Sequence, residues 1–166
     1  LSHEWRDLNG GVDGIVHAMY VDSINNELYV GGTFQHAGGN FSSCIAKWDS
    51  VQWTSIGNDT IKGHPDVRCI VKFNGDIIVG GYFDSIGMVR MNNIARWDGV
   101  RWNPMGYGFS RAVTCLLEYN GELYAGGSFE YSGNDTILHI AKWNGNNWLN
   151  LPGNAALGND VETMTQ

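Results

Sequence analysis

The chain has 166 residues, of which 10 are Lys or Arg and 17 are Asp or Glu, giving a formal net charge of −7. Its basic residues are scattered singly rather than gathered in a stripe, which argues against nucleic acid and anionic membrane surfaces as partners. No apolar run approaches the roughly 20 residues that a membrane-spanning helix needs, so membrane insertion is not expected.

A short apolar segment ending in two glycines occurs three times, at residues 28–32, 77–81 and 123–127. Each copy is followed by Ile-Ala-Lys/Arg-Trp and, five residues after that Trp, by a second Trp. The repeated residues are Gly31, Gly32, Gly80, Gly81, Gly126, Gly127, Trp48, Trp53, Trp97, Trp102, Trp143 and Trp148. The glycine pairs recur after 49 and then 46 residues, a period that indicates one structural unit repeated around an axis.

Each unit contains four strand-sized runs rich in Val, Ile, Tyr and Trp and bounded by Gly, Asn and Asp. The first strand of each unit is expected at residues 16–21, 67–73 and 113–119. The second is expected at 27–31, 76–80 and 122–126. The third ends in the Ile-Ala-Lys/Arg-Trp segment, and the fourth begins at the second Trp. Turn dipeptides such as Asn74-Gly75 and Asp98-Gly99 accept the positive φ of two-residue hairpins, so each unit is predicted to be an antiparallel meander.

In chain order, residues 1–14 are predicted to hold the fourth strand of a preceding unit and a connection. Complete units follow at 15–58, 67–108 and 113–153. Residues 160–166 match the first strand of a following unit. The predicted fold class is therefore all-β: a β-propeller of four-stranded antiparallel blades, with three complete blades, a leading fourth strand and a trailing first strand.

Three blades and two spare strands do not close a ring, because propellers typically need four to eight blades. One explanation is that the sequence is an internal piece of a longer propeller, which we favour. The other is that several chains complete a ring together, which would create hybrid blades lacking a second and a third strand. In the first case, the rest of its own propeller is one expected partner.

The repeat resembles that of kelch-type β-propellers, in which a Gly-Gly ends the second strand and aromatic residues follow on the third and fourth. It is closer to a kelch-like variant found in secreted bacterial proteins, LYVGG-x-F followed by IA-x-WDG-xx-W-xx-LG. The spacing of the aromatic residues departs from the usual kelch motif, and Trp stands where Tyr is commoner. The resemblance implies the fold, but propellers host many unrelated activities.

The repeated residues are expected to serve packing rather than ligand binding, because identity in every unit is what a packing layer requires. The paired glycines would allow close backbone approach, and the Trp pairs would pack between neighbouring blades. The core is also expected to contain Cys69 and Cys115, which share one repeat position, and the residues two positions after each glycine pair: Phe34, Phe83 and Phe129.

Asp followed by Ser or Thr and an aliphatic residue occurs five times, always in expected loops or turns. The pattern resembles the O-glycosylation acceptor that one group of Gram-negative bacteria uses on exported proteins, so the chain is predicted to be extracellular or on the cell surface. The candidate acceptors are Ser23, Ser50, Thr60, Ser85 and Thr136. The alternative is that Asp-Ser and Asp-Thr simply form good turns.

Long loops are expected between the second and third strands and between successive units, and in a meander both emerge at one edge. We expect a surface protein or a glycan to bind there, through four aromatic candidates: Tyr82, Tyr107, Phe109 and Tyr131. The favoured function is therefore a binding or scaffold module, with no catalytic or metal-binding residue assigned and no cofactor expected. The alternatives are the propeller part of a secreted enzyme, galactose-oxidase-like or glycan-active, and a structural subunit of a surface or secretion assembly.

Overall fold

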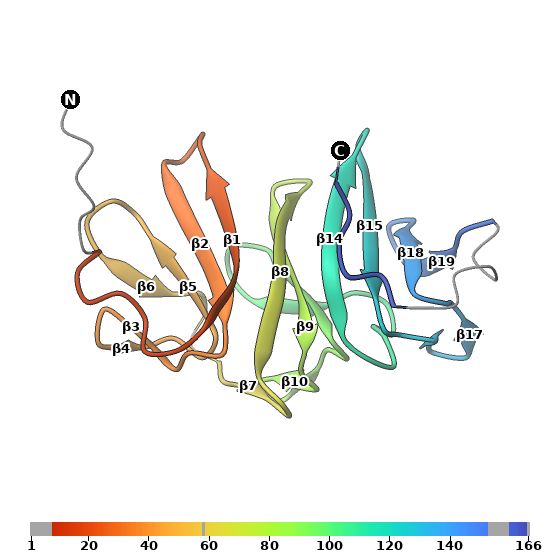
Figure 1. The fold of residues 1–166 in the computed structure, drawn as a ribbon, viewed down its shortest axis with the longest axis horizontal. Coiled ribbons are helices and arrows are strands. Elements are labelled where there is room, and N and C mark those ends of the chain that lie inside the picture. The colour runs from red at the N-terminus through yellow and green to blue at the C-terminus, as the bar shows by residue number, and fades with distance from the viewer. Residues whose placement is uncertain (1–7, 58, 153–159, 166) are drawn as a thin grey trace.

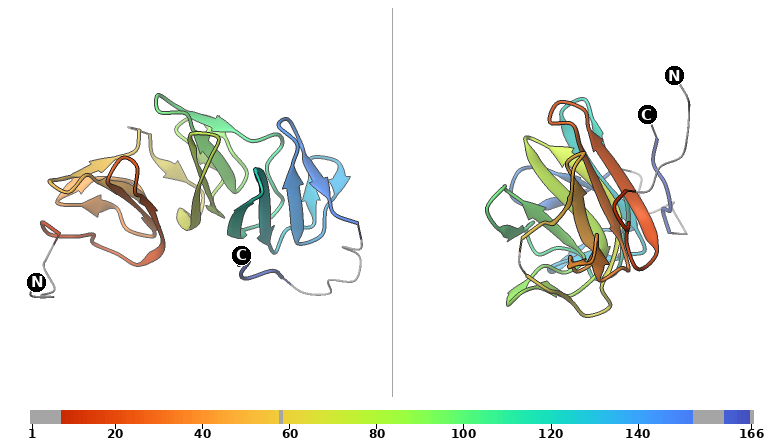
Figure 2. Two further views of the ribbon diagram at one scale, coloured as in Figure 1. Left: turned by 90° about the horizontal axis from the view of Figure 1, so that it is seen from above. Right: turned by 90° about the vertical axis from the view of Figure 1, so that its left-hand side faces the viewer.

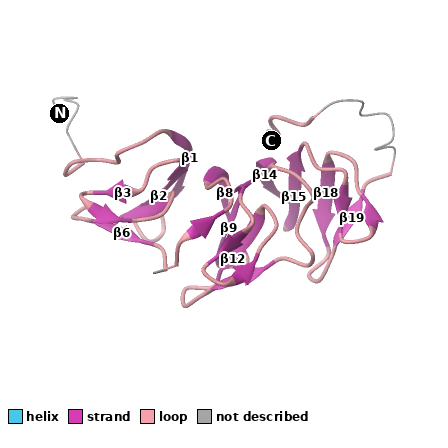
Figure 3. Ribbon diagram, turned by 90° about the horizontal axis from the view of Figure 1, so that it is seen from below, coloured by secondary structure: helices cyan, strands magenta, loops and turns pink. Residues whose placement is uncertain are grey.

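The structure of the protein, a computed structural model, describes residues 8–57, 59–152 and 160–165. These residues form strands, turns and loops, and no helix occurs among them (Figure 3). The predicted all-β class is confirmed.

Three four-stranded antiparallel sheets follow one another in chain order and stand side by side (Figures 1 and 2). Sheet 1 consists of β1 (Val16–Asp22), β2 (Glu27–Gly32), β5 (Ile45–Trp48) and β6 (Trp53–Ser55). Sheet 2 consists of β8 (Asp66–Phe73), β9 (Asp76–Tyr82), β12 (Ile94–Trp97) and β13 (Trp102–Pro104). Sheet 3 consists of β14 (Val113–Tyr119), β15 (Glu122–Gly127), β18 (Ile140–Trp143) and β19 (Trp148–Asn150). In each sheet, strands adjacent in this order are hydrogen-bonded neighbours, which is the predicted meander.

The predicted two-residue turns have the expected backbone. Asn74 and Asn120 have φ of 51° and 53°, and the glycines that follow them, Gly75 and Gly121, have φ of 91° and 77°. Asparagine and glycine adopt this left-handed region at low cost, so the dipeptides fix the tight connection between the first two strands of sheets 2 and 3.

The segments between the second and third strands were expected to be loops, but each contains a short hairpin. The pairs are β3 (His36–Ala37) with β4 (Asn40–Phe41), β10 (Ser85–Ile86) with β11 (Val89–Arg90), and β16 (Tyr131–Ser132) with β17 (Asp135–Thr136). Each turn begins with a glycine at positive φ, namely Gly38, Gly87 or Gly133. A further strand, β7 (Ile61–Lys62), pairs with β10 and ties the connection between sheets 1 and 2 to this hairpin. These elements lie along the lower edge of the molecule in Figure 1.

The second glycine of each pair lets the first strand of its own sheet approach. A Cβ atom at this position would lie 1.8, 1.9 or 2.2 Å from a backbone carbonyl oxygen in sheets 1, 2 and 3 respectively. The glycines concerned are Gly32, Gly81 and Gly127, and the carbonyl groups belong to Ile15, Asp66 and Ala112. Only a residue without a Cβ fits at this point, as predicted.

The first glycine of each pair receives a valine from the segment that follows its sheet. A Cβ atom on Gly31, Gly80 or Gly126 would lie 2.5, 2.6 or 2.7 Å from the valine Cγ1. The valines are Val67 of sheet 2, Val113 of sheet 3 and Val161 of the last described segment. The same glycine–valine contact therefore joins each sheet to whatever comes next in the chain.

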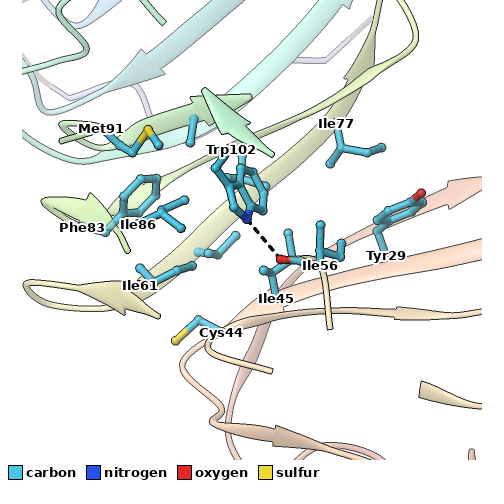
Figure 4. Close-up of a cluster of buried hydrophobic side chains, with 13 residues drawn as sticks. Tyr29, Cys44, Ile45, Ile56, Ile61, Ile77, Phe83, Ile86, Met91 and Trp102 are labelled. Carbon is cyan, nitrogen blue, oxygen red and sulfur yellow. Dashed lines mark hydrogen bonds between the residues drawn. The ribbon is translucent and has the colours of Figure 1, made fainter. Parts of the chain in front are cut away.

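In sheets 2 and 3 the second Trp of the pair reaches back to the preceding sheet, whereas Trp53 of sheet 1 donates to the carbonyl oxygen of Leu8 at 2.6 Å. Trp102 is 5 % exposed and its indole N–H donates to the carbonyl oxygen of Ile56 at 3.1 Å (Figure 4). Trp148 is 2 % exposed and donates to the carbonyl oxygen of Met105 at 3.2 Å. The paired Trp rings are tilted against each other with centroids 5.1–5.4 Å apart. The prediction that the Trp pairs pack between units is confirmed.

The largest apolar clusters fill the two spaces between neighbouring sheets. Between sheets 1 and 2, Tyr29 and Ile45 pack with Ile77, Phe83 and Trp102 (Figure 4). The predicted core residues are buried as well: Phe34, Phe83, Phe129, Cys69 and Cys115. All three cysteines are buried and free, and burial raises the pKa of the Cys44 thiol to about 11.

The predicted leading strand falls at residues 5–8 and lies almost wholly outside the described residues. The predicted trailing strand at 160–166 is not formed over 160–165, which have no regular strand structure. The N–H of Val161 donates to the Gly127 carbonyl at 3.3 Å, and the Val161 carbonyl accepts from the Thr114 hydroxyl at 2.5 Å and from Cys115 Sγ at 3.8 Å. In sheets 1, 2 and 3 the first strand is held by backbone pairing with the second strand of its own sheet. The described residues contain no second strand that could pair with 160–165 in this way.

An ion pair links sheets 1 and 2 at the opposite edge from the short hairpins. Lys72 Nζ donates to Asp22 Oδ2 at 2.6 Å, and the side-chain amide of Asn25 donates to the same oxygen at 2.8 Å. These hydrogen bonds, that from Lys72 foremost, lower the pKa of Asp22 from 3.8 to about 2. Because this pKa is depressed in the folded protein, the ion pair stabilises it fully above about pH 4 and is lost as pH falls toward 2.

We expect the urea midpoint of unfolding to fall between about pH 4 and pH 2, and to fall less in Asp22→Asn, which keeps a side-chain acceptor but no titrating group. Urea titrations at half-unit pH steps test this. Other carboxyl groups such as Asp13 and Asp98 also have a pKa of about 2, so the informative quantity is the difference between the two proteins. Parallel pH profiles would contradict the assignment.

Candidate functional site

The short hairpins and the connections between sheets meet along one edge, which we call the loop edge. Around sheets 2 and 3 it is formed by residues 84–93, 106–112 and 130–139. These are the segments that were predicted to emerge together, and the structure brings residues of all three around one pocket.

The residue before each third strand has a positive φ, and its backbone hydrogen bonds hold the loop edge in place. Its N–H donates to the carbonyl oxygen of the buried Phe at 2.8–2.9 Å, and its own carbonyl accepts from the second glycine at 2.9–3.0 Å. The residues are Cys44, Asn93 and His139, with φ of 70°, 71° and 63°. The backbone here is the same in all three units, while the side chain differs.

In sheet 2 two asparagines hold the connection to sheet 3. The Asn93 amide accepts from the N–H of Phe83 at 3.0 Å and donates to the carbonyl oxygen of Phe109 at 2.9 Å. The Asn92 side chain donates to the carbonyl oxygen of Tyr107 at 2.7 Å, and its carbonyl accepts from the N–H of Phe109 at 2.8 Å. Three of these hydrogen bonds reach the connection, one at Tyr107 and two at Phe109, and they fix its backbone before any ligand arrives.

The pocket between the loop ends of sheets 2 and 3 has a volume of about 290 Å³. Tyr107 is 70 % exposed, and its ring lies against Gly133, where a Cβ would come within 2.7 Å of Cδ2. Tyr131 is 47 % exposed, and its backbone is tied to Ser110 by two hydrogen bonds of 3.0 and 3.1 Å. The pocket thus presents two exposed phenol rings on supported backbone.

Polar groups complete the pocket, and sequence reasoning did not identify them. Arg90 lies at its rim and donates from Nε to Asn92 Oδ1 at 2.8 Å, while Asp84 and Ser110 also line it. Arg90 ends β11 and pairs with Ser85 of β10, which places it near Asp84, the residue before β10. The two-residue turn signal at Gly87-Met88 was the one feature of the sequence from which this juxtaposition could have been predicted.

Two of the four aromatic candidates do not belong to this pocket's exposed surface. Phe109 lines the pocket but is only 3 % exposed and stacks on Phe129 with ring centroids 4.0 Å apart, so its ring offers little surface to a ligand. The chain turns inward there because Gly108, at φ 64°, precedes it. Tyr82 is 42 % exposed but lies in a second pocket, and its ring stacks on His64 with centroids 4.9 Å apart.

The candidate glycosylation residues occupy different environments. Ser23, Ser50, Thr60 and Thr136 are exposed, whereas Ser85 is half-buried. Ser85 and Thr136 lie in the short strands β10 and β17, so the expectation that all five lie in loops or turns was wrong for these two. Glycosylation of the five residues stays a prediction.

Two of the five tripeptides have a structural explanation for their aspartate. Asp49 Oδ1 accepts from the N–H groups of Val51 and Gln52 at 2.9 and 2.8 Å. Asp22 caps its turn in the same way and also binds Lys72. Side-chain capping by aspartate is a common way to fix a turn, so the acid is needed there whether or not the hydroxyl is modified.

Within residues 8–57, 59–152 and 160–165, no three His, Cys, Asp or Glu side chains gather closely enough to hold a metal ion. The same residues contain no helix with the length and hydrophobicity to cross a bilayer. Comparison of the chain with protein-family models and with curated proteins finds no match to either.

Proposed function

We propose that the three sheets are consecutive blades of a kelch-like β-propeller, and that the chain is an exported binding module that recognises a glycan at the pocket between sheets 2 and 3. The observation that carries the proposal is the pair of exposed rings, Tyr107 and Tyr131, on hydrogen-bonded backbone at one polar pocket.

The propeller proposal is supported by the repeated interface. β8 contacts both β1 and β14, so the first strands of the three sheets are neighbours on one side of the molecule. Val67 and Val113 are fully buried, whereas the equivalent Val16 of sheet 1 is 39 % exposed, and Met19 on the same strand is 69 % exposed. A further sheet of the same repeat would cover this face of sheet 1. Sheet 1 covers the equivalent face of sheet 2 in this way, and sheet 2 covers that of sheet 3.

The glycan proposal is supported by the chemistry of the pocket. Sugars offer apolar C–H faces that pack on aromatic rings and hydroxyl groups that both donate and accept hydrogen bonds. Tyr107 and Tyr131 offer the rings, Arg90 a donor and Asp84 an acceptor. Because the asparagines already fix the loop, little ordering is needed on binding.

Replacing Tyr107 or Tyr131 by alanine is expected to weaken glycan binding by roughly threefold to tenfold each, because each removes one stacking surface. The double variant is expected to lose detectable binding. The measurement uses an array of neutral and acidic oligosaccharides, followed by titration calorimetry with the best one.

Tyr119→Ala is the matched control, since Tyr119 is 49 % exposed at the opposite edge of sheet 3. All variants should unfold at the urea concentration of the parent protein to within a small shift. Unchanged binding in the double variant, or no glycan bound by the parent protein, would overturn the proposal in favour of a protein partner or a structural spacer.

Export is the remaining part of the proposal, and it rests on the candidate acceptors Ser23, Ser50, Thr60, Ser85 and Thr136. A chain purified from its native source would carry hexose-type mass increments that disappear when these residues are replaced. A native peptide mass without increments would remove the support for export.

A further inference from the structure

A second pocket, of about 310 Å³, opens on the loop edge beside the first. It is lined by Arg68, Tyr82, Arg111, Ala112 and Ser128. No carboxylate belongs to this lining. Its ionisable and polar side chains are two guanidinium groups, a phenol and a hydroxyl, so it presents mainly hydrogen-bond donors. Each guanidinium also forms an ion pair with a carboxylate outside the lining, Arg68 with Asp66 and Arg111 with Glu130.

The two guanidinium groups keep donors free. Arg68 uses Nε for a 2.7 Å hydrogen bond to Asp66 Oδ2, and neither of its Nη atoms bonds to a described residue. Arg111 Nη1 lies 3.6 Å from Glu130 Oε1, beyond hydrogen-bond distance. Their side chains are 43 % and 62 % exposed, so an incoming anion can reach both.

The backbone explains why Arg68 reaches this pocket. The register of β8 against β9 shifts between Val67 and Cys69, and Arg68 is the extra residue of this β-bulge. A bulge re-aims a side chain without breaking the sheet. The same bulge occurs in β1 at His17 and in β14 at Thr114. A fixed backbone feature therefore carries a different side chain in each sheet, and only sheet 2 places an arginine there.

The two pockets are continuous along the chain. Ser110 lines the first pocket and Arg111 the second, and Glu130 beside Arg111 precedes Tyr131 of the first pocket. Consecutive residues of one connection therefore line the two pockets, and a ligand that covers both would contact Ser110 in the first and Arg111 in the second.

We infer that this second pocket binds the anionic group of the ligand whose sugar rings contact Tyr107 and Tyr131, so the ligand is an acidic glycan bearing a carboxylate or a sulfate. The inference rests on the proposed function and narrows it. A carboxylate or sulfate would pair with the free Nη donors of Arg68 and Arg111, and such charge-assisted hydrogen bonds are stronger than neutral ones. The Tyr82 and Ser128 hydroxyls would donate to the same oxygens.

The test uses the whole chain on an array of neutral, uronate-bearing, sialate-bearing and sulfated oligosaccharides. The expected result is preferential binding of acidic members, weakened by added NaCl. Arg68→Gln and Arg111→Gln should each reduce that binding by at least roughly tenfold and leave neutral members unaffected. Comparison of a uronate oligosaccharide with its methyl ester, and of a sulfated one with its desulfated form, identifies the anion.

Arg101→Gln is the control, because Arg101 is 78 % exposed on a turn at the opposite edge. Binding of neutral glycans alone, or acidic binding indifferent to both pocket variants, would overturn this inference while leaving the glycan-binding proposal intact. If no glycan binds, or if Tyr107→Ala with Tyr131→Ala has no effect, the proposed function fails first and this inference with it.

Discussion

Replacing Gly81 by alanine is expected to lower the free energy of unfolding by about 3 kcal/mol or more, at the upper end of what overpacking costs. The new Cβ would lie 1.9 Å from the Asp66 carbonyl oxygen, and it would meet backbone rather than a side chain that can rotate away. The first two strands of sheet 2 would have to separate at the point where the bulge at Arg68 begins. Urea denaturation followed by far-UV circular dichroism gives the change directly.

Gly99→Ala serves as the comparison for Gly81→Ala. A Cβ at Gly99 meets nothing within 4 Å, but the residue has φ of 93°, so alanine there is strained through its backbone alone. The cost of that strain is about 1–2 kcal/mol. Equal destabilisation by the two substitutions would show that the close approach at Gly81 is not the reason for the glycine.

Truncation of Trp102 to alanine is expected to cost about 3–5 kcal/mol, the range for removing a large buried aromatic side chain. Its ring lies in the cluster between sheets 1 and 2 and is 5 % exposed (Figure 4). Because the lost contacts lie between two sheets, the near-UV circular dichroism should weaken before the strand signal does. Denaturation monitored at both wavelengths tests this.

Trp102→Phe separates the ring from its hydrogen bond. Phenylalanine keeps most of the apolar contact but leaves the buried carbonyl of Ile56 without its donor, which costs about 1–3 kcal/mol. Trp97→Phe is the matched control, since Trp97 is only partly buried and no hydrogen bond of its indole is found among the described residues. If the two phenylalanine variants were equally stable, the interface hydrogen bond would contribute nothing.

The sheets could be predicted from sequence because their determinants are local and repeated. Strand runs and a fixed spacing of Gly-Gly and Trp appear in each unit, and Asn-Gly turns appear in the second and third, so three copies support one interpretation. The short hairpins were missed although Ala37-Gly38-Gly39-Asn40 contains a two-residue turn signal. Their strands are two residues long, too short to show the alternation by which strands are recognised.

The candidate site was only partly predictable, because it depends on which loop residues turn inward. Tyr107 and Phe109 are two residues apart in one connection, yet one is 70 % exposed and the other 3 %. The difference arises from Gly108 and from hydrogen bonds to Asn92 and Asn93, which lie in a different segment. No pattern within residues 106–112 could have indicated this difference in exposure. No pattern in the sequence could have indicated that Arg68 and Arg111 line the same pocket either.

The contact of a valine with the first glycine of the preceding pair gives the assembly a direction. Each sheet offers its first glycine at one face, and sheets 2 and 3 insert their own valine into the sheet before them, as Val67 does with Gly31 and Val113 with Gly80. Such a head-to-tail joint differs from a self-complementary one, because it accepts another copy of the unit at either end without limit. Gene duplication can then lengthen the array without a new interface, because each added unit brings both halves of the joint.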